Sequence, residues 1–521
     1  MTEATEPSAL AARAADTHVV VVGGGIGGLI AARECAKVGM RVTVLEEADA
    51  VGGAIRRAEL DGVAVDAGAE SFATRGGHVR ALIAELGLTD RIVAPEAGSA
   101  WLVGIPGVGA APLPVGGILG IPANPFQDDV RRIIGWSGAW RAYLDRVRPP
   151  LTIGHQLSLG RLVSSRMGAK VRDRLVAPVT TGVYSASPDD VDVDVAAPGL
   201  NAALTRVGSL SGAVQAVREE NAARAAKAGT GSTPKAPGAA VEGLTGGMSV
   251  LVEALVNDLR RLGAEVRTDS GVQGVERSGR RWTIRIAQEQ EQEQEQEQEQ
   301  EQEQEQENGT SDLVADALVV ATGESAARTL LASAVPALAE TEPSASPEIE
   351  VVTLLLDAPA LEPAPRGTGV LTVPGSHIAK ALTHSTAKWG WLRRAAAGRH
   401  VVRVSFGAQG EPAATAGLSD DEAAALALGE ASALLGVPLG ADALLAAHRA
   451  RYVQSQPASI IGAGERRATA RAAVRAVPGL AVVGAWLAGT GLAQVIPDAK
   501  DEADRLRGTL LWTGDGPRVN P

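Results

Sequence analysis

Three glycines and one glutamate near the N-terminus have the types and the spacing needed to bind a dinucleotide. Gly23, Gly25 and Gly28 form a G-x-G-x-x-G series, and Glu46 follows about 20 residues later. In such a unit the first glycine permits a tight turn, the second lets the backbone approach a pyrophosphate, and the third lets a helix pack closely on a strand. The acid can accept a hydrogen bond from a ribose hydroxyl. The expected contacts are Gly23, Gly25, Ile26, Gly27, Gly28, Glu46 and Glu47.

The elements that must position these residues are readable in the same stretch. Val19–Val22 is a continuous β-branched run, as in a buried parallel strand. Residues 29–38 favour a helix, Gly39 suits its C-terminal end, and Arg41–Leu45 predicts a second strand. This order of strand, glycine turn, helix, strand and acid favours dinucleotide binding over a glycine-rich turn in some other α/β protein.

Length and composition bound the class of protein. A chain of 521 residues predicts two or more domains, and aromatic residues are only 3% of it, so aliphatic side chains must fill the core. Cys35 is the single cysteine, so no intramolecular disulfide is expected and a reducing cytosol fits. Ten glutamates between residues 288 and 307 account for most of the formal charge of −12 and leave the rest near −2. The chain carries no overall excess of positive charge, so its charge does not suggest a nucleic-acid partner.

Three stretches are expected to be low in order: residues 1–17, read as a disordered leader, residues 221–240, and the Glu/Gln tract at 288–307. The tract falls between strand-like Arg281–Ile286 and Asp316–Val320, which predicts an expanded hairpin loop. No apolar run is long enough to span a bilayer, and the protein is expected in the cytoplasm, with peripheral membrane contact left open.

Further elements recur toward the C-terminus. Thr245–Leu262 predicts a turn and an amphipathic helix, and Ala264–Thr268 a short strand. Gly479–Val483 predicts a buried strand, a glycine-rich turn covers Gly484–Leu492, and Asp498–Leu511 predicts a final helix. A strand, a glycine-rich turn and a helix, the order typical of a nucleotide-binding sheet, occur at both ends of the chain. This implies one domain assembled from distant segments, with a second domain interleaved.

No catalytic set stands out. The seven histidines are scattered, no His, Cys or Asp group has metal-ligand spacing, and no G-x-S-x-G motif occurs. We therefore expect no metal site and name no general base.

A second series of motifs narrows the family. Val51-Gly52-Gly53-Ala54-Ile55-Arg56-Arg57 and then Asp66-Ala67-Gly68-Ala69-Glu70-Ser71-Phe72 follow the acid. In this order they resemble the flavin amine oxidase and porphyrinogen oxidase superfamily. Asp173–Pro188, the GGM-x-x-L of residues 246–251, Thr383–Leu392, Arg403–Gly407 and Gly484–Pro497 resemble segments of bacterial coproporphyrinogen III and protoporphyrinogen oxidases.

The resemblance implies an FAD-binding domain of the Rossmann-like, glutathione-reductase and amine-oxidase type, in an α/β protein with an interleaved mixed-sheet substrate domain and a helical subdomain. It implies FAD segments at residues 18–94, 241–335 and 471–521, a helical segment at 95–240 facing substrate or membrane, and a substrate sheet at 336–470. The implied cofactor contacts beyond the glycine turn are Gly53, Ala54, Arg57, Gly68, Ala69, Glu70, Ser71, Val272, Thr322, Trp389, Gly484, Val495, Ile496 and Pro497. Arg56 is an alternative to Arg57.

The resemblance also implies a reaction. FAD would take hydride from a porphyrinogen in two-electron steps, six electrons in all, and dioxygen would reoxidise the flavin to give hydrogen peroxide. The substrate carries acidic propionates, and Arg75 is the best candidate to bind one, with Lys388 and Arg403 weaker candidates. Coproporphyrinogen III, an intermediate of haem synthesis, is the favoured substrate, and contact with other haem-synthesis enzymes is open.

Three alternatives stay open at this point. Protoporphyrinogen could be the substrate, the protein could be an amine oxidase or desaturase, or it could be a binding protein of the GDP-dissociation-inhibitor kind that lacks flavin chemistry. The sequence departs from the family pattern at Gly489–Ala493 and Val453–Glu465, which leaves substrate contacts and the level of activity undetermined there.

Overall fold

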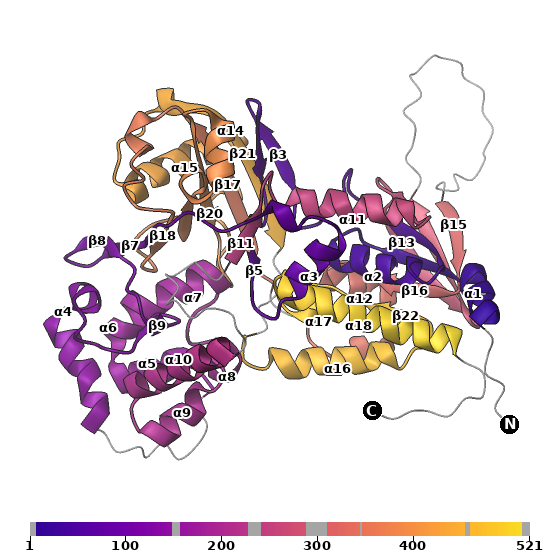
Figure 1. Ribbon diagram of the computed structural model, residues 1–521, viewed down its shortest axis with the longest axis horizontal. Helices are drawn as coiled ribbons and strands as arrows, with labels where there is room; N and C mark the ends of the chain where they lie inside the picture. The colour runs from indigo at the N-terminus through magenta and orange to yellow at the C-terminus, as the bar shows by residue number, and fades with distance from the viewer. Residues whose placement is uncertain are drawn as a thin grey trace, which may run out of the picture.

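The computed structural model describes residues 7–147, 157–227, 241–287, 310–343, 346–453 and 459–512. Three regions are visible: a parallel sheet flanked by long helices, a second sheet with α15 on it, and a group of helices (Figure 1). None of the helices in these ranges is both long and apolar enough to cross a membrane.

A five-stranded parallel sheet holds the N-terminal motif. Its strand order is β12-β2-β1-β16-β22, and every neighbouring pair is parallel. The strands are β1 (His18–Val22), β2 (Arg41–Leu45), β12 (Glu265–Arg267), β16 (Ala317–Val320) and β22 (Leu480–Val482). They come from three distant parts of the chain, so the sheet is assembled from separate segments.

Both faces of this sheet are buried, which explains the continuous apolar runs. On one face pack α2 (Ile26–Ala36), α11 (Ser249–Arg261) and α18 (Leu492–Leu511). On the other pack the antiparallel strands β13 (Val272–Ser278), β14 (Arg281–Ala287) and β15 (Thr310–Ala315), with α12 (Glu324–Leu331) and α16 (Ala463–Arg475). The expected boundary at residues 470 and 471 lies inside α16.

The second sheet has seven strands in the order β21-β17-β20-β19-β18-β7-β8, and only β18 and β7 run parallel. Its strands are β7 (Ala100–Ile105), β8 (Gly109–Pro112), β17 (Glu348–Leu356), β18 (Gly369–Thr372), β19 (Ala381–His384), β20 (His400–Phe406) and β21 (Leu444–Val453). One face packs on α15 (Asp420–Leu435), which begins with a Ser419/Glu422 capping box. The other carries α13 (Ser385–Lys388), α14 (Gly390–Ala396) and the hairpin β3 (Arg57–Leu60) and β4 (Val63–Asp66).

The helical region has its own apolar core. Its helices are α4 (Asp128–Tyr143), α5 (Leu159–Met167), α6 (Ala169–Val171), α7 (Ala177–Tyr184), α8 (Val193–Ala196), α9 (Leu200–Val207) and α10 (Leu210–Lys227). The same segment also supplies β7 and β8 to the seven-stranded sheet, so it is helical only in part.

Two stretches expected to lack order are helical where the structure describes them. Helix α1 (Pro7–Asp16) occupies most of the expected leader, and its Ala14 is 1% exposed in the core beside α18. Helix α10 continues to Lys227, inside the stretch 221–240, whose remaining residues lie outside the described ranges. Alanine-rich sequence has the highest helix propensity, and a small packing contact is enough to fix it.

Two element predictions were wrong in detail. Strand β14 pairs antiparallel with β15, whereas Asp316–Val320 belongs to the parallel sheet, so the hairpin closes one strand earlier than expected. The Glu/Gln tract that joins β14 to β15 lies outside the described residues. The final helix begins at Leu492 instead of Asp498, and it contains Pro497 in its second turn, where a missing N–H costs one helical hydrogen bond.

Candidate functional site

The glycine turn between β1 and α2 divides its work among three positions. Gly23 adopts φ +106° and donates its N–H to the Leu45 carbonyl at 2.7 Å. A Cβ on Gly28 would lie 2.0 Å from the Gly23 oxygen, so only glycine lets the helix approach. A Cβ on Gly25 would have no heavy atom within 4 Å. The turn therefore leaves free space over its second glycine.

The start of α2 is open to an anion. Gly25 is the N-cap, and no side chain accepts a hydrogen bond from the first N–H groups of the helix. The helix dipole also favours negative charge at this end. A phosphate or pyrophosphate group is an anion that such a helix start can bind.

The expected adenosine side comes together at the ends of β2 and β12. Glu46 Oε2 accepts from the Gly24 N–H at 2.6 Å, and Oε1 accepts from the Ala48 N–H at 3.1 Å. Ser270 donates its N–H to the Glu46 carbonyl at 2.8 Å. A Cβ on Gly271 would lie 3.6 Å from Glu47 Cγ, which places the half-buried Val272 beside this acid pair.

The other strand ends close the same edge. Val483 donates its N–H to the Val320 carbonyl at 2.9 Å, which sets the segment before Gly484 against the segment before Thr322. A Cβ on Gly27 would lie 3.3 Å from Gly484 Cα and 3.4 Å from Val495 Cγ1. Ile496 is buried next in α18, and the half-buried Pro497 follows. Ligands of open α/β sheets bind at this carboxyl edge of the strands.

The second glycine pair lies against the first turn. Gly52 donates its N–H to the Gly24 carbonyl at 2.9 Å, and a Cβ on Gly53 would lie 3.3 Å from Gly25 Cα. Ala69 donates its N–H to the Ala54 carbonyl at 2.9 Å. The two segments that follow the glycine turn in the sequence are therefore hydrogen-bonded to each other beside it.

The segment around Gly68 also needs its glycine. A Cβ on Gly68 would lie 2.0 Å from the Ala54 oxygen, and the half-buried Ser71 follows two residues after Ala69. Arg57 is exposed at the start of β3, opposite Asp66, and the neighbouring Arg56 is exposed as well.

Glu70 has partners that the sequence did not predict for it. Its Oε1 accepts from Lys388 Nζ at 2.5 Å, and its Oε2 accepts from Ser385 Oγ at 3.0 Å and lies 3.1 Å from Arg403 Nη1. Burial by itself raises the pKa of Glu70, but Lys388 and Arg403 outweigh it and lower the pKa to about 2. Lys388 and Arg403, weaker substrate candidates in the sequence, thus hold the segment after Gly68 on the second sheet.

Asp66 is a buried carboxyl that sequence reasoning missed. It accepts the Met248 N–H at 2.8 Å, and burial raises its pKa to about 6 despite the opposing charge of Arg403. Arg403 also donates to the Ala67 carbonyl at 3.2 Å. Asp66 opens the motif that ends at Phe72, but the sequence analysis gave it no role of its own.

Trp389 is buried in a core cluster between the β3–β4 hairpin and the second sheet. A Cβ on Gly243 would lie 2.9 Å from its ring, and its Nε1 has no partner among the described residues. Its contact with a cofactor stays a prediction.

Arg75 lies at a meeting point of two regions. It is exposed, and with the Gln494 amide oriented to satisfy both of its atoms, Arg75 Nη2 donates to the Gln494 side-chain oxygen at 3.1 Å. Its charge also opposes the burial that raises the pKa of Tyr184 at the end of α7. Gln494 stands in the first turn of α18, and neither it nor Tyr184 was singled out in the sequence.

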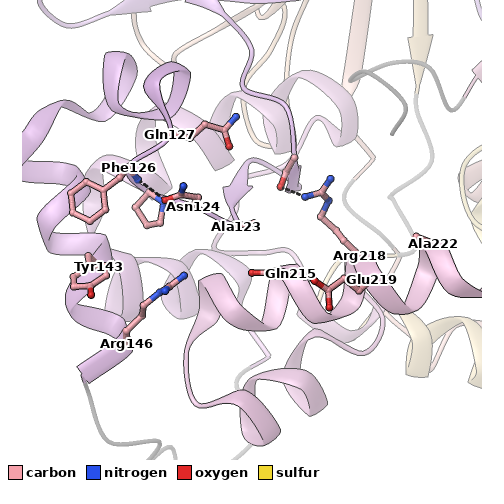
Figure 2. Close-up of a pocket in the computed structure, with 12 residues that line it drawn as sticks. Ala123, Asn124, Phe126, Gln127, Tyr143, Arg146, Gln215, Arg218, Glu219 and Ala222 are labelled. Carbon is pink, nitrogen blue, oxygen red and sulfur yellow. Dashed lines mark hydrogen bonds between the residues drawn. The ribbon is translucent and has the colours of Figure 1, made fainter. Parts of the chain in front are cut away.

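A separate cavity of about 670 Å³ lies in the helical region between α4 and α10. Figure 2 shows Arg146 and Arg218 coming from different helices that border it, with Phe126 and Tyr143 on the α4 side. None of the expected cofactor residues lines it.

Comparison with known proteins identifies the family. The model of the flavin containing amine oxidoreductases matches residues 26–507. This chain belongs to that family. The oxidoreductase is similar to a coproporphyrinogen III oxidase of Propionibacterium freudenreichii subsp. freudenreichii, at 29% identity over 97% of this chain and 94% of the relative. A coproporphyrinogen III oxidase of Bacillus subtilis is 25% identical over 93% and 96%.

Solved structures agree on the fold of this flavin oxidoreductase. A crystal structure from Exiguobacterium sp. 255-15, of a protein provisionally named a protoporphyrinogen oxidase, superposes with a TM-score of 0.76 at 21% identity over 94% of this chain and 99% of that one. Putrescine oxidase bound to putrescine superposes with a TM-score of 0.60 at 14% identity over 95% and 99%. The predicted fold class is confirmed.

The family implies a flavin cofactor, and the residues present fit one. The space left open over Gly25 and the uncapped start of α2 could accept the phosphates of the cofactor. The acid pair after β2 lies along the same edge, where a ribose would bind. Another open position follows at Gly323, where a Cβ would also have no heavy atom within 4 Å. Within the described ranges no group of three or more His, Cys, Asp or Glu could hold a metal ion.

Proposed function

We propose that this flavin oxidoreductase uses FAD to oxidise coproporphyrinogen III to coproporphyrin III in haem synthesis. The observation that carries the proposal is the match to named coproporphyrinogen III oxidases across both sheets and the helical region, 97% of the chain in one relative. FAD, in preference to a mononucleotide, is supported by the place of Glu46, Glu47 and Val272 at the edge of the sheet where an adenosine would bind.

FAD when bound supplies hydride acceptance, and dioxygen takes the electrons onward to hydrogen peroxide. The overall change balances as one porphyrinogen and three dioxygen giving one porphyrin and three hydrogen peroxide. The chain itself binds and orients the reactants. The glycine turn and the start of α2 hold the pyrophosphate, Glu46 accepts from the ribose, and the start of α18 faces Arg75.

Arg75 is the propionate-binding residue in this proposal. A guanidinium presents paired donors that match a carboxylate, and Arg75 is tied to α18 through Gln494. Coproporphyrinogen has four propionates and protoporphyrinogen two, so a propionate-binding arginine favours the first substrate. A chloroplastic and mitochondrial protoporphyrinogen oxidase of Arabidopsis thaliana matches only 49% of this chain, at 26% identity.

The deciding experiment is a paired assay of the purified yellow protein. We expect porphyrin fluorescence to rise faster with coproporphyrinogen III than with protoporphyrinogen IX, with oxygen consumed and hydrogen peroxide formed. Faster turnover of protoporphyrinogen would change the proposed substrate to protoporphyrinogen IX. Turnover of putrescine with no turnover of either porphyrinogen would move it to amine oxidation, and absence of a flavin spectrum after added FAD would leave a binding protein.

Peripheral membrane contact is a further part of the proposal. Helix α4 and the turn after it expose Trp136, Trp140, Leu144 and Val147, each more than half exposed. Arg131 lies over the Trp136 ring at 4.4 Å. Tryptophan beside arginine favours the headgroup layer of a membrane. The cytoplasm remains the proposed location, supported by the lone, buried Cys35.

A further inference from the structure

Lys380 is a half-buried cation without a counter-ion. It directly precedes β19, and its Nζ donates to Ser185 Oγ at 2.7 Å. Among the described residues no carboxylate forms an ion pair with it, and burial alone lowers its pKa to about 8. Burying a charge without a partner is costly, so a partner from outside the chain is expected.

Two residues beside Lys380, Ser185 and Gln409, have further unusual features. Ser185 is buried and adopts φ +54°, a left-handed conformation that costs energy for serine and is concentrated at functional sites. Gln409 donates its N–H to the Ser185 carbonyl at 2.9 Å, and its own side-chain oxygen is buried with no partner among the described residues. The corner thus combines a cation, a hydroxyl and an unused acceptor.

This corner lies beside the proposed substrate position. Ser185 directly follows Tyr184, whose ring is within the electrostatic reach of Arg75. A Cβ on Gly182 would lie 2.5 Å from Leu371 Cδ2, so α7 packs against β18 of the second sheet. Lys380 donates its own N–H to the Ser405 carbonyl, which fixes it to β20. The end of α7 therefore joins Arg75, near the start of α18, to Lys380 on the sheet.

We propose that Lys380, positioned by Ser185, is a second carboxylate-binding subsite, which binds a propionate of the macrocycle while Gln409 accepts a pyrrole N–H. The subsite rests on the proposed function, because only a ring with several carboxylates can reach Arg75 and Lys380 together. It makes Lys380 a specificity-determining residue, since the two propionates of protoporphyrinogen lie on neighbouring rings, whereas coproporphyrinogen carries one on every ring and can reach two anchors that lie farther apart.

The test measures binding of coproporphyrin III and of protoporphyrin IX to the FAD-loaded protein by porphyrin fluorescence, with steady-state kinetics on coproporphyrinogen III. We expect Lys380→Met to weaken coproporphyrin binding and raise KM by about tenfold, with little change in kcat. Protoporphyrin binding should change much less. Lys380→Arg should bind coproporphyrin with most of the wild-type affinity, because arginine keeps the positive charge. A lysine with a merely structural role would not show this dependence on charge.

Lys170→Met is the matched control, because Lys170 makes the same lysine–serine contact, to Ser137 Oγ at 2.8 Å, on the exposed surface. It should leave both affinities unchanged. Ser185→Gly serves as a second variant that relieves the left-handed strain and removes the hydroxyl, and it should fold and still bind coproporphyrin more weakly.

Two failures are distinguishable. Wild-type protein that binds neither porphyrin would reject the proposed function. If folded Lys380→Met and Ser185→Gly bind coproporphyrin as tightly as the wild-type protein does, the subsite alone is rejected.

Discussion

Gly25 and Gly28 belong to one motif and yet face opposite surroundings. The position of Gly28 is filled by the Gly23 carbonyl, while Gly25 borders free space and has φ −67°, which alanine adopts without strain. The same substitution should therefore have different effects at the two positions.

We predict that Gly25→Ala keeps the unfolding temperature of the apoprotein and lowers its affinity for FAD, because the methyl group occupies the place of the pyrophosphate. Gly28→Ala should destabilise the fold itself by about 1–3 kcal/mol through overpacking. Thermal unfolding without cofactor and titration with FAD separate the two effects. Equal loss of apoprotein stability in both variants would contradict this division of roles.

Glu70 offers a prediction with a defined pH dependence. Its pKa is lowered from 4.5 to about 2, so its carboxylate contributes stability that is complete above about pH 4.5 and is lost as the pH falls toward 2. Glu70→Gln leaves Lys388 and Arg403 without their anion and should cost about 3–5 kcal/mol at pH 7. The difference between variant and wild type should shrink below pH 4.5.

Urea unfolding at a series of pH values measures this difference. The control is Glu265→Gln, which breaks the exposed pair with Arg267 and should change the free energy of unfolding by no more than about 1 kcal/mol. A Glu70→Gln effect as small as that of the control would mean that the ion pairs contribute nothing.

At the scale of elements, local signals sufficed where neighbours in sequence are neighbours in space. The strand, turn, helix and strand from His18 to Leu45 were predicted because Val19–Val22, the glycines and Gly39 each act within a few residues. The ion pairs of Glu70 were not, since Lys388 is 318 residues away and no periodicity encodes that separation.

Two errors have a common physical cause. Alanine-rich α1 and the end of α10 were taken as low in order because they lack large apolar side chains, but alanine forms helix readily once one side finds a contact, as Ala14 does.

The early closure of the β14–β15 hairpin was missed because Thr310–Ala315 is polar in part, and its pairing depends on the partner strand.

The hairpin supports a prediction about the Glu/Gln tract. Strands β14 and β15 stay in register from Trp282 with Ala315 to Ala287 with Thr310, so the pairing is set by the strands and not by the connection. Replacing residues 288–307 with a short glycine–serine loop should change the free energy of unfolding by less than about 1 kcal/mol. Denaturant unfolding and FAD binding test this, and loss of FAD binding would assign the tract a role in the site.

At the scale of the whole molecule, helix α4, which carries the exposed Trp136 and Trp140, lies in the helical region away from the parallel sheet (Figure 1). We predict that the protein floats with vesicles of phosphatidylglycerol and that the double variant Trp136→Ala, Trp140→Ala reduces the bound fraction several-fold. Trp512→Ala is the control, because Trp512 is 65% exposed at the opposite region after α18. Equal loss in the control would show that binding is not directed by α4.

The edge strand β22 has a consequence for how the protein is made. The parallel sheet lacks its last strand until Leu480 has emerged from the ribosome, and α18, which packs on α2, emerges later still. One edge of β16 therefore stays unpaired from the emergence of Val320 until that of Leu480, and we expect cofactor loading to be completed only after α18 has emerged. Chains released early by a stop codon would accumulate as apoprotein with an open sheet edge, a template for aggregation.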